Sequence, residues 1–149
     1  MSSKERSYIS FGSQMGDIRA ADVVQKHLIE LRRFLQIYCQ DRYADKLDRF
    51  ALVLRVDGDT WFWNFEGCQN LRLMRGKRYI TVDIGMPRNR WEGASDLEIR
   101  RYLVKNLKNA LHLIVSRLKK EYMEVDEEKL FFDFAKVEKE FLEMTSSEQ

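Results

Sequence analysis

The sequence is poor in the residues that interrupt regular structure. Its 149 residues include 7 glycines and one proline, whereas 34% are charged and 44% are hydrophobic. This balance excludes collagen-like, linker-rich and largely disordered chains. A chain of this length can bury about two-thirds of its unfolded surface. We therefore expect a single domain over residues 1–149, frayed at residues 1–6 and 145–149.

Long hydrophobic runs and cysteine clusters are absent too. No run of about eighteen uncharged apolar residues occurs, and the start, MSSKERSYISFG, lacks the apolar segment of a secretory signal. Only Cys39 and Cys68 are present, without CxxC spacing, which argues against a disulfide framework or a zinc knuckle. We therefore expect a cytoplasmic protein with two reduced thiols and no membrane contact.

Signatures of catalysis are also missing. His27 and His112 lie in separate predicted helices without HExxH spacing, and the glycines form no phosphate-binding loop. Asp57 and Asp59 resemble the start of a calcium loop, but the residues after them supply no spaced oxygen ligands. We expect no catalytic residues, no metal and no cofactor. An uncharacterised enzyme that uses dispersed carboxylates stays open as an alternative.

The sequence does contain a clear change of hydrophobic period. Steps of three and four residues predict helices over 17–41, from a capping box at Ser95 to about residue 122, and from residue 126 onward. Between residues 47 and 86 the period is two, and a short strand is expected within 8–16. These patterns predict an α+β fold. We expect an antiparallel meander sheet of three to five strands, with one helix before it and two helices after it packed mainly on one face.

The aromatic stretch over residues 55–67 raises the question of where its tryptophans lie. If Asp57 and Gly58 form a two-residue hairpin turn, Leu54 opposes Trp61 on one apolar face, and Trp63 lies on that face as well. A three-residue loop would mix polar groups into this face, and each buried unpaired group costs about 1–3 kcal/mol. We therefore predict that both tryptophans belong to the core.

The opposite face of the sheet is then predicted to carry apolar and polar groups together. They are Val53, Phe62 and Tyr79 among Arg55, Asn64 and Asp83. Such a mixture is typical of a transient protein interface. Alternatively, the N-terminal strand, the last helix or a second copy in a homodimer covers this face.

The loop from Gly85 to Ser95 holds the only proline and places Arg88, Arg90 and Trp91 between a strand and a capped helix. Arginine and tryptophan are favoured anchors of protein interfaces, and loops on a rigid scaffold often carry recognition. Phe62, Tyr79, Arg88, Arg90 and Trp91 are therefore our candidate partner-binding residues. In the alternative structural interpretation, Trp91 plugs one end of the core while both arginines are solvated.

Charge is distributed unevenly along the chain. Residues 1–120 carry 23 Lys or Arg against 14 Asp or Glu, whereas residues 121–149 carry 3 against 10. This asymmetry indicates an acidic segment that folds over a basic body or two surfaces for different partners, and solvated helix faces explain it equally well. A helical stripe of Arg101, Lys105, Lys108 and His112 makes a nucleic-acid-binding or regulatory module the main alternative function.

The expected elements follow one another as one helix, a Trp-rich stretch GDTWFWNF, a loop MPRNRWEG and two further helices. No group of catalytic residues accompanies them. In this organisation the chain resembles the small cytosolic immunity proteins of bacterial polymorphic-toxin and contact-dependent inhibition systems. The resemblance implies a protein that binds a cognate toxin domain stoichiometrically and occludes it. Immunity proteins against nucleases are commonly acidic, whereas this chain has a net charge of +2. Either its acidic last helix binds the partner, or the toxin is not a basic nuclease.

Overall fold

The computed structural model describes residues 8–13, 22–41, 43–44, 47, 49–56, 66–74, 76 and 79–144. Their elements follow one another as β1 (Tyr8–Ser13), α1 (Asp22–Tyr38), β2 (Arg49–Val56), β3 (Gly67–Met74), β4 (Tyr79–Met86), the 3-10 helix η4 (Arg88–Arg90), α2 (Asp96–Lys120) and α3 (Glu127–Leu142). The class is α+β, as predicted, and β1 is the expected short strand before the first helix. Within these ranges no helix is both long and apolar enough to cross a membrane.

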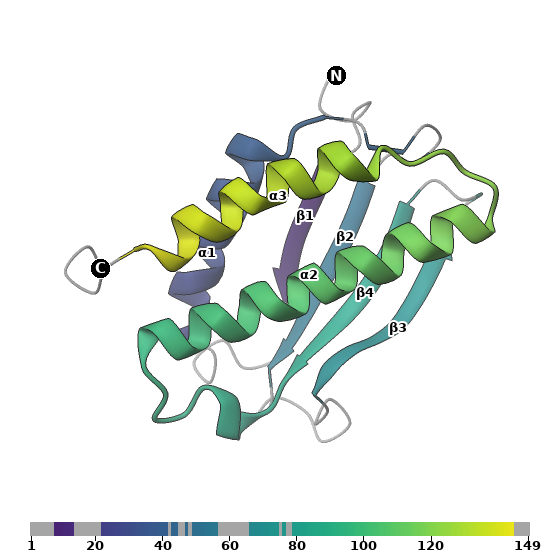
Figure 1. Ribbon diagram of the computed structural model, residues 1–149. Helices are drawn as coiled ribbons and strands as arrows, with labels where there is room; N and C mark the ends of the chain where they lie inside the picture. Colours follow the sequence, from purple (N-terminus) through teal and green to yellow (C-terminus); the bar gives the residue numbers. More distant parts are fainter. Residues whose placement is uncertain are drawn as a thin grey trace.

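The strands form a mixed sheet in the order β1-β2-β4-β3 (Figure 1). β2 is parallel to both of its neighbours, and only β3 and β4 pair antiparallel. The predicted meander of three to five antiparallel strands was therefore wrong. Strands that follow one another in sequence are neighbours in only about two-thirds of cases. Here the chain reverses direction in β3 and again in β4, so β4 runs parallel to β2. β4 lies between β2 and β3 in the sheet.

The predicted hairpin after β2 was wrong for the same reason. Leu54 is in register with Ser13 of β1 on one side and with Ile84 of β4 on the other. Both edges of β2 are thus occupied by β1 and β4 at this position, whereas a hairpin would require the next strand in sequence to pair with β2 there. Residues 57–65, which include Trp61, Phe62 and Trp63, lie outside the described residues.

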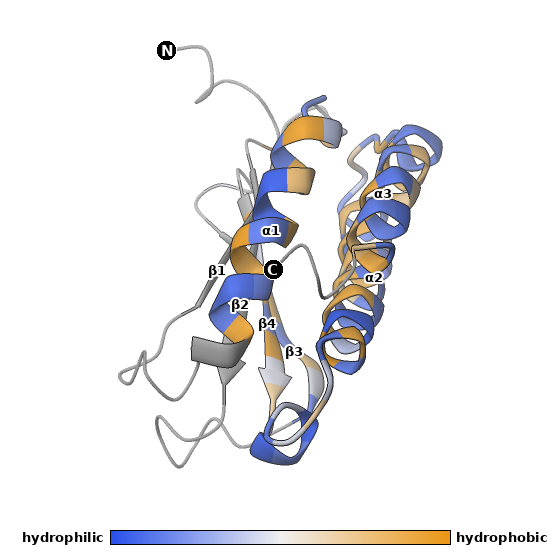
Figure 2. Cartoon of the chain, turned by 90° about the vertical axis from the view of Figure 1, so that its left-hand side faces the viewer, coloured by the Kyte–Doolittle hydropathy of each residue, from blue (hydrophilic) through white to orange (hydrophobic). Residues whose placement is uncertain are grey.

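The three α-helices lie on one side of the sheet, as predicted (Figure 2). α1 packs on β1, α2 packs on β3 and β4, and α3 packs on both other helices. Figure 2 also shows the hydrophobic sides of α2 and α3 turned inward and their hydrophilic sides turned outward. Burial of these apolar stripes supplies the main stabilising term of such a layered fold.

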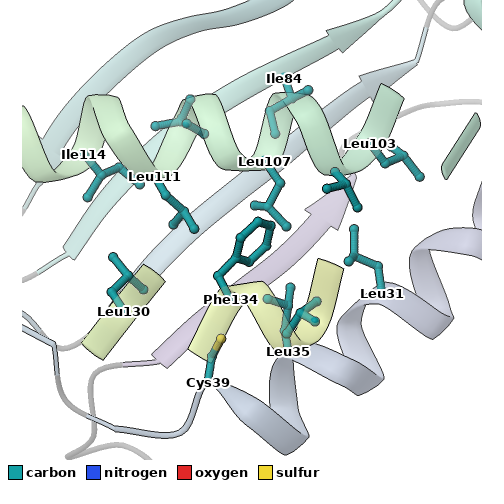
Figure 3. Packing of buried hydrophobic residues seen from close by; sticks show 14 of the residues in the cluster. Leu31, Leu35, Cys39, Ile84, Leu103, Leu107, Leu111, Ile114, Leu130 and Phe134 are labelled. Atoms are coloured by element: carbon teal, nitrogen blue, oxygen red, sulfur yellow. The ribbon is translucent and has the colours of Figure 1, made fainter. Parts of the chain in front are cut away.

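The core lies between the helices and the sheet and contains buried side chains from all three α-helices and from β4. Figure 3 shows Phe134 of α3 pointing toward Leu107 of α2, with Leu35 of α1 close beside it. The apolar residues of α2 that recur in steps of three and four are entirely buried, at 0% exposure for Leu103, Leu107, Ala110, Leu111, Ile114 and Leu118. Ile80, Val82 and Ile84 of β4 are equally buried, as expected for side chains that face the helices, although Asp83 in the same strand is buried too.

The start of α2 is fixed by the predicted capping box. Ser95 Oγ accepts a hydrogen bond from the Glu98 backbone N–H at 3.1 Å, and Glu98 Oε1 accepts one from the Ser95 N–H at 2.9 Å. Two amides that a helix leaves unpaired are thereby satisfied. The cap therefore fixes the residue at which the loop after β4 ends and α2 begins.

Candidate functional site

The loop between β4 and α2 turns sharply and separates its three candidate residues. The backbone N–H of Trp91 donates to the carbonyl of Arg88 at 3.1 Å, and Gly93 has a φ of 78°, a value that favours glycine. The Trp91 side chain is only 7% exposed and joins the core. Arg88 and Arg90 are exposed. The alternative in which Trp91 plugs the end of the core is therefore the one that the structure shows.

Both arginines are nevertheless held in place. The Arg88 guanidinium carbon lies 5.4 Å from the centre of the Trp91 ring, and its Nη1 lies 3.7 Å from Oε2 of Glu92. Arg90 forms an ion pair with Glu66, and its guanidinium carbon lies 5.8 Å from the centre of the Tyr102 ring. Contacts of this kind reduce the conformational entropy that a side chain loses on binding.

Tyr102 connects this loop to the sheet. Its hydroxyl donates a 2.6 Å hydrogen bond to the carbonyl of Gly85, at the end of β4. Burial raises the pKa of Tyr102 to about 12, so the hydroxyl stays a neutral donor near neutral pH. Sequence reasoning missed Tyr102 and Glu66, because neither belongs to a motif and their contacts with Arg90 are made only in the folded chain.

A groove of about 440 Å³ lies between the loop and the first turns of α2. We call it the α2 groove; it is lined by Asn89, Arg90, Glu92, Gly93 and Ala94 of the loop and by Glu98, Arg101, Tyr102 and Lys105 of α2. The structure thus brings the predicted binding residue Arg90 together with two members of the predicted basic stripe. Arg88 and Trp91 do not line it.

The charges of the α2 groove differ in how far they are neutralised. Arg90 is paired with Glu66, and the Glu98 carboxylate is turned back to the backbone of Ser95. Arg101 and Lys105, both exposed, form no ion pair with any residue in the described ranges. Two solvated positive charges therefore remain on the α2 wall of the groove.

The rest of the predicted basic stripe is interrupted by α3, which runs antiparallel to α2 (Figure 1). Lys108 Nζ lies 3.7 Å from Oε1 of Glu138, and the His112 ring stacks on Phe131 with 4.3 Å between ring centres. The same packing pairs Lys119 with Glu127 at 2.6 Å. Of the three interpretations of the charge asymmetry, an acidic segment folded over a basic body agrees with these pairs.

The other predicted surface is not brought together with the groove. Tyr79 begins β4 and is in backbone register with Met74 of β3, at the opposite end of the strand from the loop. Asp83, expected among the polar groups of an open sheet face, is only 4% exposed and accepts a 2.9 Å hydrogen bond from Asn70. The expected open face does not extend to Asp83.

The remaining reactive side chains are dispersed. Cys39 and Cys68 are free thiols, and burial raises their pKa values to about 12 and about 11. His27 is buried beside Asp96. Among the described residues, no three His, Cys, Asp or Glu side chains form a group that could hold a metal ion.

Comparison with known proteins yields one match. The family model described as Immunity protein 44 matches residues 7–140, which is most of the chain. Neither the curated proteins nor the solved structures contain a significant match. The matched segment spans all the helices and strands described above except the last two residues of α3.

Proposed function

This chain belongs to the Immunity protein 44 family, and we propose that it neutralises a cognate bacterial toxin by binding it in a stoichiometric complex and occluding it. The match over residues 7–140 is the observation that carries this proposal. In this proposal the protein works in the cytoplasm of a bacterium with a polymorphic-toxin or contact-dependent inhibition system. No catalytic step is needed, because the complex itself removes the toxin from action.

The proposed contact surface is the loop that follows β4, together with the α2 groove. Arg88 and Arg90 are exposed there, yet ordered by ion pairs and by aromatic rings beneath them. Preordered arginines are effective anchors because little conformational entropy is lost when they bind. Trp91 would support this surface from within the core. Phe62 and Tyr79 remain proposed contacts on the grounds of sequence alone.

A nucleic-acid-binding function has weaker support. Binding along a phosphate backbone relies on several unpaired cations that follow the strand. Of the four stripe residues on α2, Lys108 is paired with Glu138 and His112 is stacked on Phe131. The two that remain lie together in one groove, which suits a local contact better than a track along a strand.

The direct test uses the toxin-like reading frame expected immediately upstream of this chain's gene. Expression of that toxin alone should stop growth, and co-expression with this chain should restore it. The purified pair should elute as a 1:1 complex, as measured by light scattering during size-exclusion chromatography. Toxicity that persists on co-expression, together with separate elution of the two proteins, would refute the proposal.

A further inference from the structure

We infer that the α2 groove receives an acidic segment of the toxin, with carboxylates bound by Arg101 and Lys105. This inference rests on the proposed function and adds the chemistry of the partner. Nothing in the family description assigns a binding site or a partner chemistry to these residues.

The first argument is the state of the two cations. Arg101 and Lys105 are four residues apart on α2, so their side chains project from the same side of the helix. Both line the groove and both lack an ion pair within the described ranges. The other cation of the groove, Arg90, already has Glu66 as its partner. The groove therefore offers two adjacent positive charges that an incoming anion can neutralise.

The second argument is the shape and composition of the wall around them. Arg101 offers a planar fork that can bind a carboxylate through two hydrogen bonds, and Lys105 adds a point charge. Tyr102, between them in sequence, adds an aromatic side chain to the lining. A volume of about 440 Å³ admits a few side chains of a peptide segment rather than a whole helix.

The third argument distinguishes a protein carboxylate from a nucleic acid. Glu92 and Glu98 also line the groove, and they would repel the successive phosphates of a strand crossing it. A single acidic loop can place its carboxylates at the two cations and keep neutral atoms beside the two glutamates. Like charges in an interface act in this way against wrong partners.

The binding experiment compares two variants with equal charge change. Arg101→Gln/Lys105→Gln removes the two unpaired cations of the groove, while Lys120→Gln/Lys136→Gln removes two exposed cations outside it. We expect the Kd for the toxin, measured by calorimetry, to rise at least about tenfold in the groove variant only. Its log Kd should also depend less steeply on salt between about 50 and 300 mM NaCl. Circular dichroism melting should be alike for both variants, since all four side chains are solvated.

A second experiment locates the carboxylate directly. A carbodiimide activates carboxyl groups and joins them to a contacting amine, so Lys105 should become linked to an Asp or Glu of the toxin. Mass spectrometry of the digested complex identifies the two linked residues. Lys105→Arg is the matched control, because it keeps the charge and the affinity but cannot form the amide.

The outcomes separate the inference from the function on which it rests. A wild-type chain that forms no toxin complex overturns both. A wild-type complex with unchanged affinity in the groove variant, or with crosslinks only from other lysines, overturns the inference alone. The same applies if the groove variant loses affinity for a fluorescein-labelled DNA 20-mer while its toxin affinity is unchanged. That result would assign the groove to a nucleic acid.

Discussion

The Tyr43 hydroxyl donates a 2.8 Å hydrogen bond to Oδ2 of Asp133, although 90 residues separate them in sequence. Both side chains are buried, at 1% and 4% exposure. The backbone strengthens the same link, since Asp126 N–H donates to the Tyr43 carbonyl at 2.7 Å and Ala44 forms a β-bridge with Val125. The segment after α1 is thereby fixed to the first turns of α3.

Replacing Tyr43 by Phe should test the strength of this link. Oδ2 of Asp133 would lose its donor, although Lys129 Nζ stays 3.5 Å from Oδ1, and leaving a buried acceptor unsatisfied costs about 1–3 kcal/mol. We expect the free energy of unfolding, measured by urea denaturation, to fall by that amount. Tyr122→Phe is the control, because Tyr122 is 97% exposed and its change should stay within about 0.5 kcal/mol. Equal effects of the two variants would contradict the proposed importance of the buried hydrogen bond.

The position of Trp91 predicts an effect on folding. Because its side chain is 7% exposed, Trp91→Ala should lower the free energy of unfolding by about 3–5 kcal/mol. Trp91 Nε1 is buried without a hydrogen-bond partner among the described residues, so Trp91→Phe removes an unsatisfied donor while keeping an aromatic ring. We expect the Phe variant to be much less destabilised than the Ala variant, as measured by urea denaturation. A fully stable Ala variant would show that the ring contributes nothing to the core.

The contact between α1 and the start of α2 predicts a dependence of stability on pH. His27 Nε2 lies 3.1 Å from Oδ1 of Asp96, and burial lowers the pKa of His27 below 6.5 although Asp96 opposes this shift. The folded chain therefore takes up this proton less readily than the unfolded chain. The free energy of unfolding should therefore be highest above about pH 6.5, where His27 is neutral in both states, and should decrease as the pH falls below that value.

Denaturation at several pH values between about 5.5 and 7.5 checks this dependence, because ordinary carboxylates stay ionised over that range. His27→Gln should flatten the dependence, since the variant has no proton to gain at this position. His112→Gln keeps His27 and should retain it. A slope that is the same in wild type and His27→Gln would assign the dependence to other groups.

The two thiols should be unreactive in the folded protein. Burial raises the pKa of Cys39 to about 12, and Cys39 is only 1% exposed. Cys68 is partly buried, has its pKa raised to about 11, and donates its S–H to the carbonyl of Asn106 at 3.3 Å. Labelling with a disulfide reagent near pH 8 should be slow in buffer and should reach two thiols in guanidinium. Fast labelling of either cysteine in buffer would contradict the burial described here.

Several elements could be predicted from the sequence because their causes are local. Ser95 and Glu98 are three residues apart, so their reciprocal capping depends on one turn of chain. Arg101 and Lys105 were expected on an exposed side of α2, and that exposure is confirmed. The role of the loop was harder to predict, because the same sequence suited either an exposed or a buried Trp91.

The sequence by itself determined the helix boundaries near Ser95 and Asp126, the buried stripes of α2 and α3, and the α+β class. These features follow from side-chain period and from caps that act within a few residues. Only the tertiary structure decided that β4 lies between β2 and β3, and that Arg90 meets Arg101 and Lys105 in one groove. Strand order and charge pairing depend on contacts between groups that are distant in sequence. These contacts form only when the whole core packs, so no local pattern in the sequence reveals them.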